Sequence, residues 1–284
     1  MHLLYYWRGD NYRADLDEGA AYNLNQSSQT LHDIALGESL WAFTRRSDGA
    51  YVLAAELVIC AKTFNNPHYK YGRYRVWGDL TLSRYFNTDE QEDISSLIQT
   101  FSISARGKNL GQAFQGHAAI RRLAKSDHQL LSAYAHALAH EPRARLLPEE
   151  TLEYYLAEGQ AAAVASLLEQ QPDGISHERR YYLRQGAYFR SRDLVRQLKS
   201  MYNGQCQLCR WPSQTHYGNH LCEAHHIQWL SRGGEDELHN LVLLCPNHHR
   251  AVHHCTSAFD LENVKFVING VDEPLELVAH RLAA

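Results

Sequence analysis

The chain has 284 residues, enough for two domains, and its hydrophobic content of 44% is ordinary for a folded protein and excludes a disordered tail. Its net charge of -4 excludes a globally basic nucleic-acid binder, so any DNA-binding surface has to be a local patch. The opening MHLLYYWRGD reaches charge too soon for a signal peptide, and no apolar run is long enough to span a bilayer. Several of the six cysteines stand at metal-ligand spacing, which indicates a reducing compartment, so we expect a cytoplasmic protein without membrane contact.

Strand signals dominate the chain up to about residue 86. LLYYW near the start predicts a first strand, and YGRYRVWGDL predicts a later one. Between them, two apolar runs flank Ser47-Asp48-Gly49, and an Asp-Gly turn between such runs is a strong hairpin signal. The sequence therefore predicts a small, mostly β domain at the start of the chain.

This part of the chain resembles the PUA-like group, which includes the EVE and SRA modules that read modified bases in DNA. The resemblance rests on the opening strand that ends in Tyr6-Trp7 and on the turn at Gly37 before the strand GESLWAF. It implies a β-rich, PUA-like barrel over residues 1–112. Reading a modified base requires aromatic faces around a flipped base, and the candidates are Tyr5, Trp7, Trp41 and Trp77. Burial in the barrel core is the alternative for each of these rings.

Helical signals follow. Thr88-Asp89-Glu90-Gln91 has the pattern of a capping box and predicts a helix that ends near Phe101. A second helix is expected from about residue 116 to 139. A third is expected after Pro148, where acidic residues occupy the first turn, and it should continue to about residue 170. Residues 113–176 are therefore predicted to be a helical connector.

Basic residues gather between residues 177 and 202. Leu194, Leu198 and Met201 recur at helical spacing and are expected to pack on the domain that follows. We expect the basic side chains to contact the DNA backbone, although a solvated helix face is the alternative; the candidates are Arg184, Arg190, Arg192, Arg196 and Lys199.

Two sets of metal ligands interleave between residues 206 and 253. The first set is C-x2-C followed by C-x2-H, which supplies the four ligands of a tetrahedral zinc ion and leaves no position open for chemistry. We assign it to a structural Zn²⁺ with the ligands Cys206, Cys209, Cys245 and His248. Other residues are close enough in sequence to substitute, namely Cys222, Cys255 and His254.

The second set consists of histidines. His249 and His253 are four residues apart, so on a helix they point to one side, and His225 on a neighbouring strand could complete a three-histidine platform with open coordination positions. His226 would point the opposite way from its strand neighbour and remain available as a base.

The whole segment resembles the HNH, or ββα-metal, nuclease family. The matching residues are Glu223, His225, His226, Gly233, Gly234, Asn240, Cys245, His248, His249 and His253. The resemblance implies that His226 is the general base, that Asn240 orients His226 or its loop, and that the three-histidine platform holds a catalytic divalent metal. Imidazole ligands admit Mg²⁺, Mn²⁺, Ni²⁺ or Zn²⁺. The nuclease domain is expected over residues 177–284, where an Asn269-Gly270 pair predicts a final hairpin.

The sequence as a whole predicts an α+β DNA endonuclease that hydrolyses phosphodiester bonds in double-stranded DNA. By resemblance, the most specific role is a restriction enzyme directed to DNA with methylated or hydroxymethylated cytosine. The alternatives are an HNH nuclease of homing or toxin type, whose N-terminal domain binds a sequence or a partner, and a zinc protein that binds DNA without cutting it. Cutting both strands with one site per chain requires a homodimer or two successive nicks.

Overall fold

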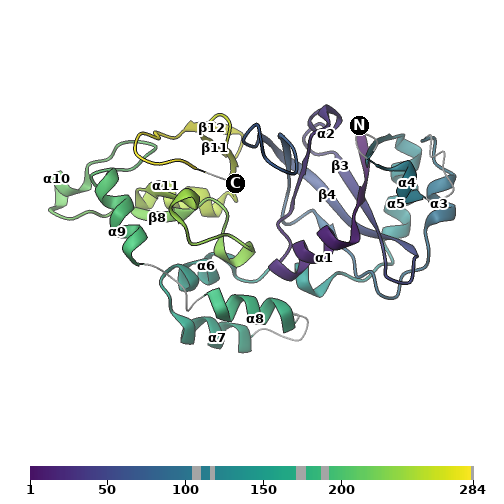
Figure 1. Cartoon of the computed structure of the whole chain (residues 1–284), viewed down its shortest axis with the longest axis horizontal. Coiled ribbons are helices and arrows are strands. Elements are labelled where there is room, and N and C mark those ends of the chain that lie inside the picture. Colours follow the sequence, from purple (N-terminus) through teal and green to yellow (C-terminus); the bar gives the residue numbers. More distant parts are fainter. Residues whose placement is uncertain (104–109, 116–118, 171–176, 187–191, 283–284) are drawn as a thin grey trace. The chain divides into compact units, whose positions relative to one another are not determined.

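The computed structural model describes residues 1–103, 110–115, 119–170, 177–186 and 192–282. Two compact units divide the chain, and Figure 1 shows their elements. The first comprises Met1–Lys62 and Lys70–Arg145, and the second comprises Thr63–Tyr69 and Leu146–Ala284. The fold is α+β, as the sequence predicts.

A seven-stranded sheet forms the first unit, in the order β2-β5-β4-β3-β1-β7, with β6 paired to β4. The first and last strands of the sheet, β2 and β7, lie at opposite edges. The described strands therefore form a half-barrel and not a closed barrel. β1 runs parallel to β3 and antiparallel to β7. The strands are β1 (His2–Trp7), β2 (Asn23–Gln26), β3 (Ser39–Arg45), β4 (Tyr51–Phe64), β5 (Tyr74–Gly78), β6 (Arg84–Tyr85) and β7 (Ile120–Leu123).

Both faces of this sheet are buried. Successive side chains of a strand point to opposite faces, so Leu3 and Tyr5 of β1 enter one core, while Leu4 enters the other. Leu16 on α1 (Gly9–Glu18) joins the first core, and Leu131 on α5 (Lys125–Ala135) joins the second. Because helices cover both faces, the central strands are almost continuously apolar, and this explains runs such as LWAF and AYVLAA.

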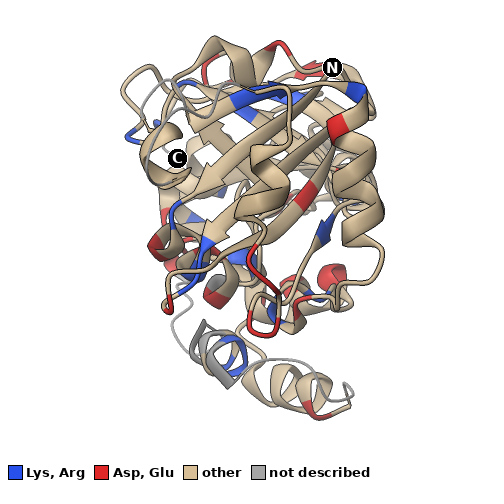
Figure 2. Ribbon diagram, turned by 90° about the vertical axis from the view of Figure 1, so that its right-hand side faces the viewer, with Lys and Arg blue, Asp and Glu red and all other residues tan. Residues whose placement is uncertain are grey.

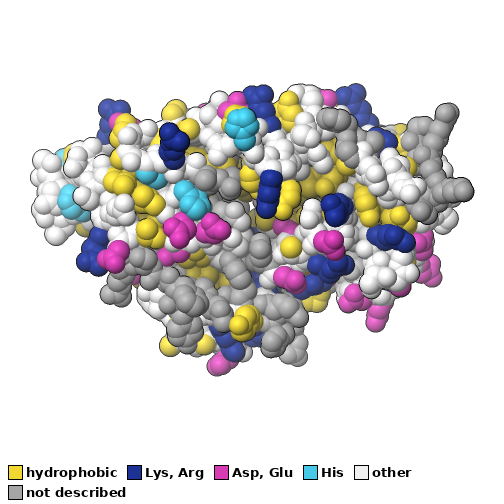
Figure 3. All heavy atoms as spheres, in the orientation of Figure 1, with side chains coloured by type: hydrophobic (Ala, Val, Ile, Leu, Met, Phe, Trp, Pro, Cys, Tyr) yellow, Lys and Arg dark blue, Asp and Glu magenta, His cyan; other side chains and the backbone are white. Residues whose placement is uncertain are grey.

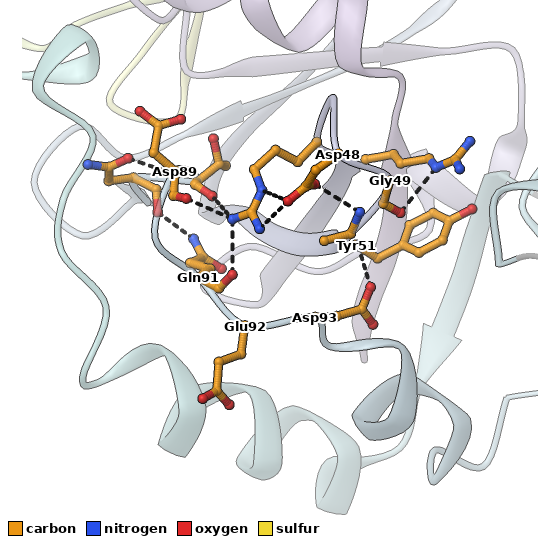
Figure 4. Close-up of polar contacts among 12 residues, drawn as sticks. Asp48, Gly49, Tyr51, Asp89, Gln91, Glu92 and Asp93 are labelled. Atoms are coloured by element: carbon orange, nitrogen blue, oxygen red, sulfur yellow. Dashed lines mark hydrogen bonds and ion pairs between the residues drawn. The ribbon is translucent and has the colours of Figure 1, made fainter.

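The predicted hairpin is confirmed: β3 and β4 pair around the Asp48-Gly49 turn, where Gly49 has a φ of 97°. Polar contacts tie Asp48 of this turn to the segment around Asp89 and Gln91, as Figure 4 shows. The guanidinium of Arg46 forms an ion pair with Asp48 at 2.7 Å and donates to the carbonyl oxygens of Thr88, Asp89 and Gln91 at 2.9, 2.8 and 3.0 Å.

The predicted helix at residue 88 is wrong in its start, because α3 spans only Ser95–Gln99. The side chain of Gln91 pairs instead with the backbone of Leu53 on β4, accepting at 2.9 Å and donating at 2.8 Å. Asp93 accepts from the backbone nitrogen of Tyr51 at 2.9 Å, as Figure 4 shows. It also accepts from the backbone nitrogen of Ser95 at 2.7 Å. The Gln91 side chain of the apparent capping box therefore bonds the backbone of β4 instead of a helix N-terminus.

Two of the elements predicted within residues 113–176 differ in the structure. Residues 120–123 form β7, which supplies the hydrogen-bonding partner that the edge of β1 needs, and α5 begins only at Lys125. The predicted start of that helix, Gly116, lies outside the described residues. The third helix is two, α6 (Glu149–Ala157) and α7 (Ala161–Glu169), because Gly159 adopts a φ of 63° and reverses the chain between them.

The second unit has two cores. The first lies among α6, α7 and α8 (His177–Gly186), and its residues are Leu147, Leu152, Leu156, Val164, Leu168, Leu183 and Leu230. The second core surrounds β9 (Leu241–Leu244). It includes Leu198 of α9 (Arg192–Met201), and Leu194 and Met201 pack against it, which confirms the predicted packing of this helix.

Short elements complete the second unit. β8 (Glu223–His226) pairs with β9, and α11 (Pro246–His254) follows directly. The predicted Asn269-Gly270 hairpin is confirmed as β11 (Lys265–Ile268) and β12 (Val271–Pro274), which form a sheet with β10 (Ala258–Asp260). The remaining described helices are α2 (Gln29–His32), α4 (Leu110–Ala113) and α10 (Ser213–Tyr217).

Charged residues of both signs are interspersed along the ribbon, as Figure 2 shows, in keeping with the small net charge. None of the helices in the described part of the chain has the length and apolar character needed to cross a membrane.

Candidate functional site

The four predicted zinc ligands come together at the start of α11. Cys245 caps this helix and His248 lies in its first turn, while Cys206 and Cys209 follow α9. Nδ1 of His248 lies 3.5 Å from Sγ of Cys206 and 3.3 Å from Sγ of Cys245, and the Sγ atoms of Cys209 and Cys245 are 3.9 Å apart. Sulfur ligands about 2.3 Å from a tetrahedral zinc ion would be about 3.8 Å apart, so this donor set fits zinc.

The candidate substitutes lie outside this ligand group. Cys222 is buried in the neighbouring core, where burial raises the pKa of its thiol to about 12, and Cys255 is exposed. Gln207, which the sequence analysis missed, fastens the cysteine turn to β9: its backbone nitrogen donates to the Leu243 carbonyl at 2.8 Å, and its side chain accepts from the Leu243 nitrogen at 2.7 Å. In the sequence, the position of Gln207 between two predicted cysteine ligands is the feature that could have indicated this role.

The three predicted histidines of the second set also come together. His225 lies on β8, while His249 and His253 lie one turn apart on α11. Nε2 of His253 is 3.1 Å from Nδ1 of His225 and 3.2 Å from Nε2 of His249. Nitrogen ligands about 2.1 Å from one ion are roughly 3.0–3.4 Å apart in octahedral or tetrahedral geometry, so the spacing fits a shared metal.

The protonation states suit a metal site. Burial, reinforced by the neighbouring histidines, lowers the pKa of His225 well below its usual value and that of His253 to about 4. Both rings are therefore neutral near pH 7, as metal ligation requires. Glu223 lies 2.7 Å from Nδ1 of His249, whose hydrogen bond holds the pKa of that carboxyl below its usual value. This contact directs Nε2 of His249 toward the other two histidines.

The cluster combines buried and accessible ligands. His225 is buried, whereas His249 and His253 are partly exposed. Figure 3 shows histidine side chains at the surface over α11 and β8, beside acidic side chains. A ligand such as a phosphate can therefore reach this cluster from solvent.

His226 points away from the metal cluster, as expected for the next residue of a strand. Its side chain is only 1% exposed and lies between two carboxylates. Nε2 is 2.9 Å from Oδ1 of Asp236, and Nδ1 is 3.4 Å from Oε1 of Glu153 on α6. Burial alone would raise the pKa of Glu153, but hydrogen bonds from His226 and from two backbone nitrogens outweigh it and leave that pKa below its usual value. The sequence analysis missed both carboxylates.

Asn240 holds the loop that follows His226 rather than the ring itself. Its amide donates to the carbonyls of Gln228 and Glu235 at 2.9 Å each and accepts from the Gln228 nitrogen at 2.8 Å. The loop is tight: a Cβ on Gly234 would lie 2.0 Å from the Gln228 carbonyl oxygen. Asn240 was expected to orient either His226 or its loop, and its side chain contacts the loop.

The predicted DNA-contacting residues lie on two helices. Arg184 of α8 is exposed, Arg196 of α9 is exposed and forms an ion pair with Asp193, and Lys199 is half-buried. Arg190 lies outside the described residues. Arg192 opens α9, but its side chain is not described.

The four candidate rings for base recognition are not brought together. Tyr5 and Trp7 lie in one core of the first unit, and Trp41 lies fully buried in the other, where its indole donates to Nδ1 of His128 at 3.0 Å. Trp77 is half-buried beneath the guanidinium of Arg75. Tyr5, Trp7 and Trp41 are therefore core residues, which is the alternative that the sequence left open for these rings.

Residues 206–254 match the model of the HNH endonuclease family. This segment is an HNH endonuclease domain. It contains both metal-ligand clusters together with His226 and Asn240. The HNH resemblance inferred from the sequence is therefore confirmed.

Among curated proteins, the chain is similar to the type IV methyl-directed restriction enzyme EcoKMcrA of Escherichia coli (strain K12). The two are 32% identical over 99 residues, which is 34% of this chain and 36% of that enzyme. The match thus spans about a third of the length of the relative.

Two solved structures are similar at low scores. The modification-dependent restriction endonuclease TagI covers 92% of this chain and 65% of its own, with 12% identity and a TM-score of 0.28. The phosphorothioation-dependent restriction endonuclease ScoMcrA covers 88% of this chain and 52% of its own, with 15% identity and a TM-score of 0.22. Scores this low do not establish a shared arrangement.

Proposed function

We propose that the protein is a DNA endonuclease that hydrolyses phosphodiester bonds by a one-metal HNH mechanism. The observation that carries this proposal is the cluster of His225, His249 and His253, spaced for one ion, directly beside His226 on β8. A structural zinc needs four closed ligands, and the chain has such a set already. A second set with three ligands leaves positions open for substrate.

Each residue has a defined role in this proposal. His226 takes a proton from the attacking water, and His225, His249 and His253 hold the divalent ion, for which Mg²⁺, Mn²⁺, Ni²⁺ and Zn²⁺ are all candidates. When bound, the ion would supply positive charge to a phosphate oxygen and to the leaving sugar oxygen. Asn240 fixes the loop behind His226, and Cys206, Cys209, Cys245 and His248 hold a structural zinc.

The first unit is the DNA reader in this proposal, with a PUA-like fold within residues 1–112, and its target is DNA with methylated or hydroxymethylated cytosine. The support is twofold. The chain folds as two units with separate cores, so that recognition and cutting can be divided, and a relative over part of the chain is named a methyl-directed restriction enzyme. Of the four candidate rings, Trp77 is the one retained as a base contact, because it is not fully buried.

The partner is double-stranded DNA, whose phosphates would be met by Arg184, Arg196 and Lys199 of the nuclease part, residues 177–284. Residues 113–176 are proposed to link the two functions. Because the described residues hold one such cluster per chain, a double-strand break is proposed to need a homodimer or two successive nicks.

The reader proposal is tested by binding, using the full chain with His226→Ala so that the DNA stays intact. Mobility shifts are measured with matched duplexes that carry cytosine, methylated cytosine or hydroxymethylated cytosine. Tighter binding of a modified duplex supports the reader, and Trp77→Ala should remove that preference. Equal affinity for all three duplexes contradicts it and favours a nuclease of homing or toxin type.

A further inference from the structure

A carboxylate outside the HNH segment contacts the proposed base. Glu153 lies on α6 in the residues expected to be a connector, and it is only 3% exposed. Its Oε1 atom lies 3.4 Å from Nδ1 of His226, within the same compact unit. Burying a carboxylate without a partner costs free energy, so a buried Glu153 is expected to have hydrogen-bonding or charged partners.

The same carboxylate holds the turn after the strand. Oε1 accepts a hydrogen bond from the backbone nitrogen of Leu230, and Oε2 accepts one from the backbone nitrogen of Ser231, both at 3.0 Å. The side chain of Leu230 packs into the core of α6, α7 and α8. Glu153 therefore fixes the turn and the histidine with one rigid group on a packed helix.

A neighbouring ion-pair network supports this arrangement. Glu149, one turn earlier on α6, pairs with Arg179 of α8 at 3.2 Å and with Arg232 of the same turn at 3.5 Å. Arg179 is fully buried and Arg232 nearly so, which makes the network part of the interior. Two carboxylates of α6 thus hold the loop that follows His226.

The two sides of the imidazole ring differ in access to solvent. Asp236, 2.9 Å from Nε2, has a side chain that is 16% exposed, whereas Glu153 on the Nδ1 side is 4% exposed. The Nε2 side of the ring, next to Asp236, is therefore the less enclosed of the two. The Nδ1 side is closed by α6.

We propose that Glu153 is a positioning residue for His226: it contacts Nδ1 of the ring and holds the Leu230-Ser231 turn, so that the ring keeps one orientation with Nε2 beside Asp236. This inference rests on the proposed nuclease function. A carboxylate that fixes the orientation of a histidine ring in this way is a general device of acid-base catalysis.

Cleavage kinetics of two matched variants test the proposal. Glu153→Gln is compared in DNA cleavage with the wild type and with Glu150→Gln as the matched control, because Glu150 is exposed on the same helix. We expect Glu153→Gln to lower kcat about 10–100-fold with little change in KM, while Glu150→Gln cuts as the wild type does. A folded Glu153→Gln protein with the kcat of the wild type would overturn the proposal.

A second readout does not depend on cleavage. Nitrogen-15 NMR of histidine-labelled protein, with the His226→Ala spectrum to assign the signals, should show the ring nitrogens of His226 shifted in Glu153→Gln and unchanged in Glu150→Gln. Unchanged His226 signals in Glu153→Gln refute the positioning role even if the wild type cuts no DNA, whereas failure of the wild type to cut refutes the nuclease function alone. If Glu153→Gln fails to fold, Glu153→Asp, which keeps the charge on a shorter side chain, is expected to show the same loss in a weaker form.

Discussion

Asn240→Ala is predicted to destabilise the nuclease part substantially. The residue is 5% exposed, and its side chain makes three hydrogen bonds to the loop between β8 and β9, at 2.8, 2.9 and 2.9 Å. Each such bond contributes about 0.5–1.5 kcal/mol, and water cannot replace them all in a buried position, so the free energy of unfolding should fall by about 2–4 kcal/mol. The loop behind His226 would also lose its fixed shape.

Urea unfolding of the zinc-loaded full chain, followed by tryptophan fluorescence, measures this change. Asn219→Ala is the matched control, because Asn219 is exposed and makes one long contact, 3.4 Å, to the Tyr217 carbonyl. The control should unfold within about 0.5 kcal/mol of the wild type, as surface substitutions usually do. An Asn240→Ala protein as stable as the control would refute the reasoning.

Three further predictions concern the second unit. Leu230 is 7% exposed and lies in the α6–α8 core, so Leu230→Ala should lower the free energy of unfolding by about 2–4 kcal/mol. A loss no larger than that caused by replacing an exposed leucine with alanine would contradict this packing. Cys209→Ser should remove one bound zinc ion per chain in a metal analysis, whereas an unchanged zinc content would exclude Cys209 as a ligand. Because the pKa of His253 is lowered from 6.5 to about 4, the unfolded chain takes up this proton first as the pH falls. The metal-free protein should therefore lose up to about 3 kcal/mol between pH 6.5 and 4, and His253→Gln should flatten that slope; parallel curves for the two proteins would contradict the shift.

Local chemistry made several features predictable from the sequence. The Asp48-Gly49 and Asn269-Gly270 turns set their hairpins through backbone conformation alone. The ligand spacings around Cys206 and Cys245 each span a single turn, so the two halves of the zinc cluster are visible as short motifs. The pair His249 and His253 is likewise fixed by the period of one helix.

Other features depend on partners distant in the chain. Gln91 completes a capping-box pattern, but the backbone of β4 competes for its side chain, and no local signal reports that competition. Glu153 looks like an ordinary helix residue, and its role depends on a turn that is far away in sequence. Trp41 shows the converse problem, because an aromatic ring in a strand has the same sequence signal in a core as in a base-binding cage.

Cleavage of DNA by the wild type and by His226→Ala tests the central claim most directly. Matched duplexes with cytosine, methylated cytosine or hydroxymethylated cytosine are incubated with each protein in Mg²⁺ and in Mn²⁺, and the products are resolved on a denaturing gel. The wild type should cut the modified duplexes, and His226→Ala should cut none while it still binds them. Equal cleavage by the two proteins, or no cleavage by the wild type in either metal, would contradict the assignment of His226 and its histidine cluster as a nuclease site.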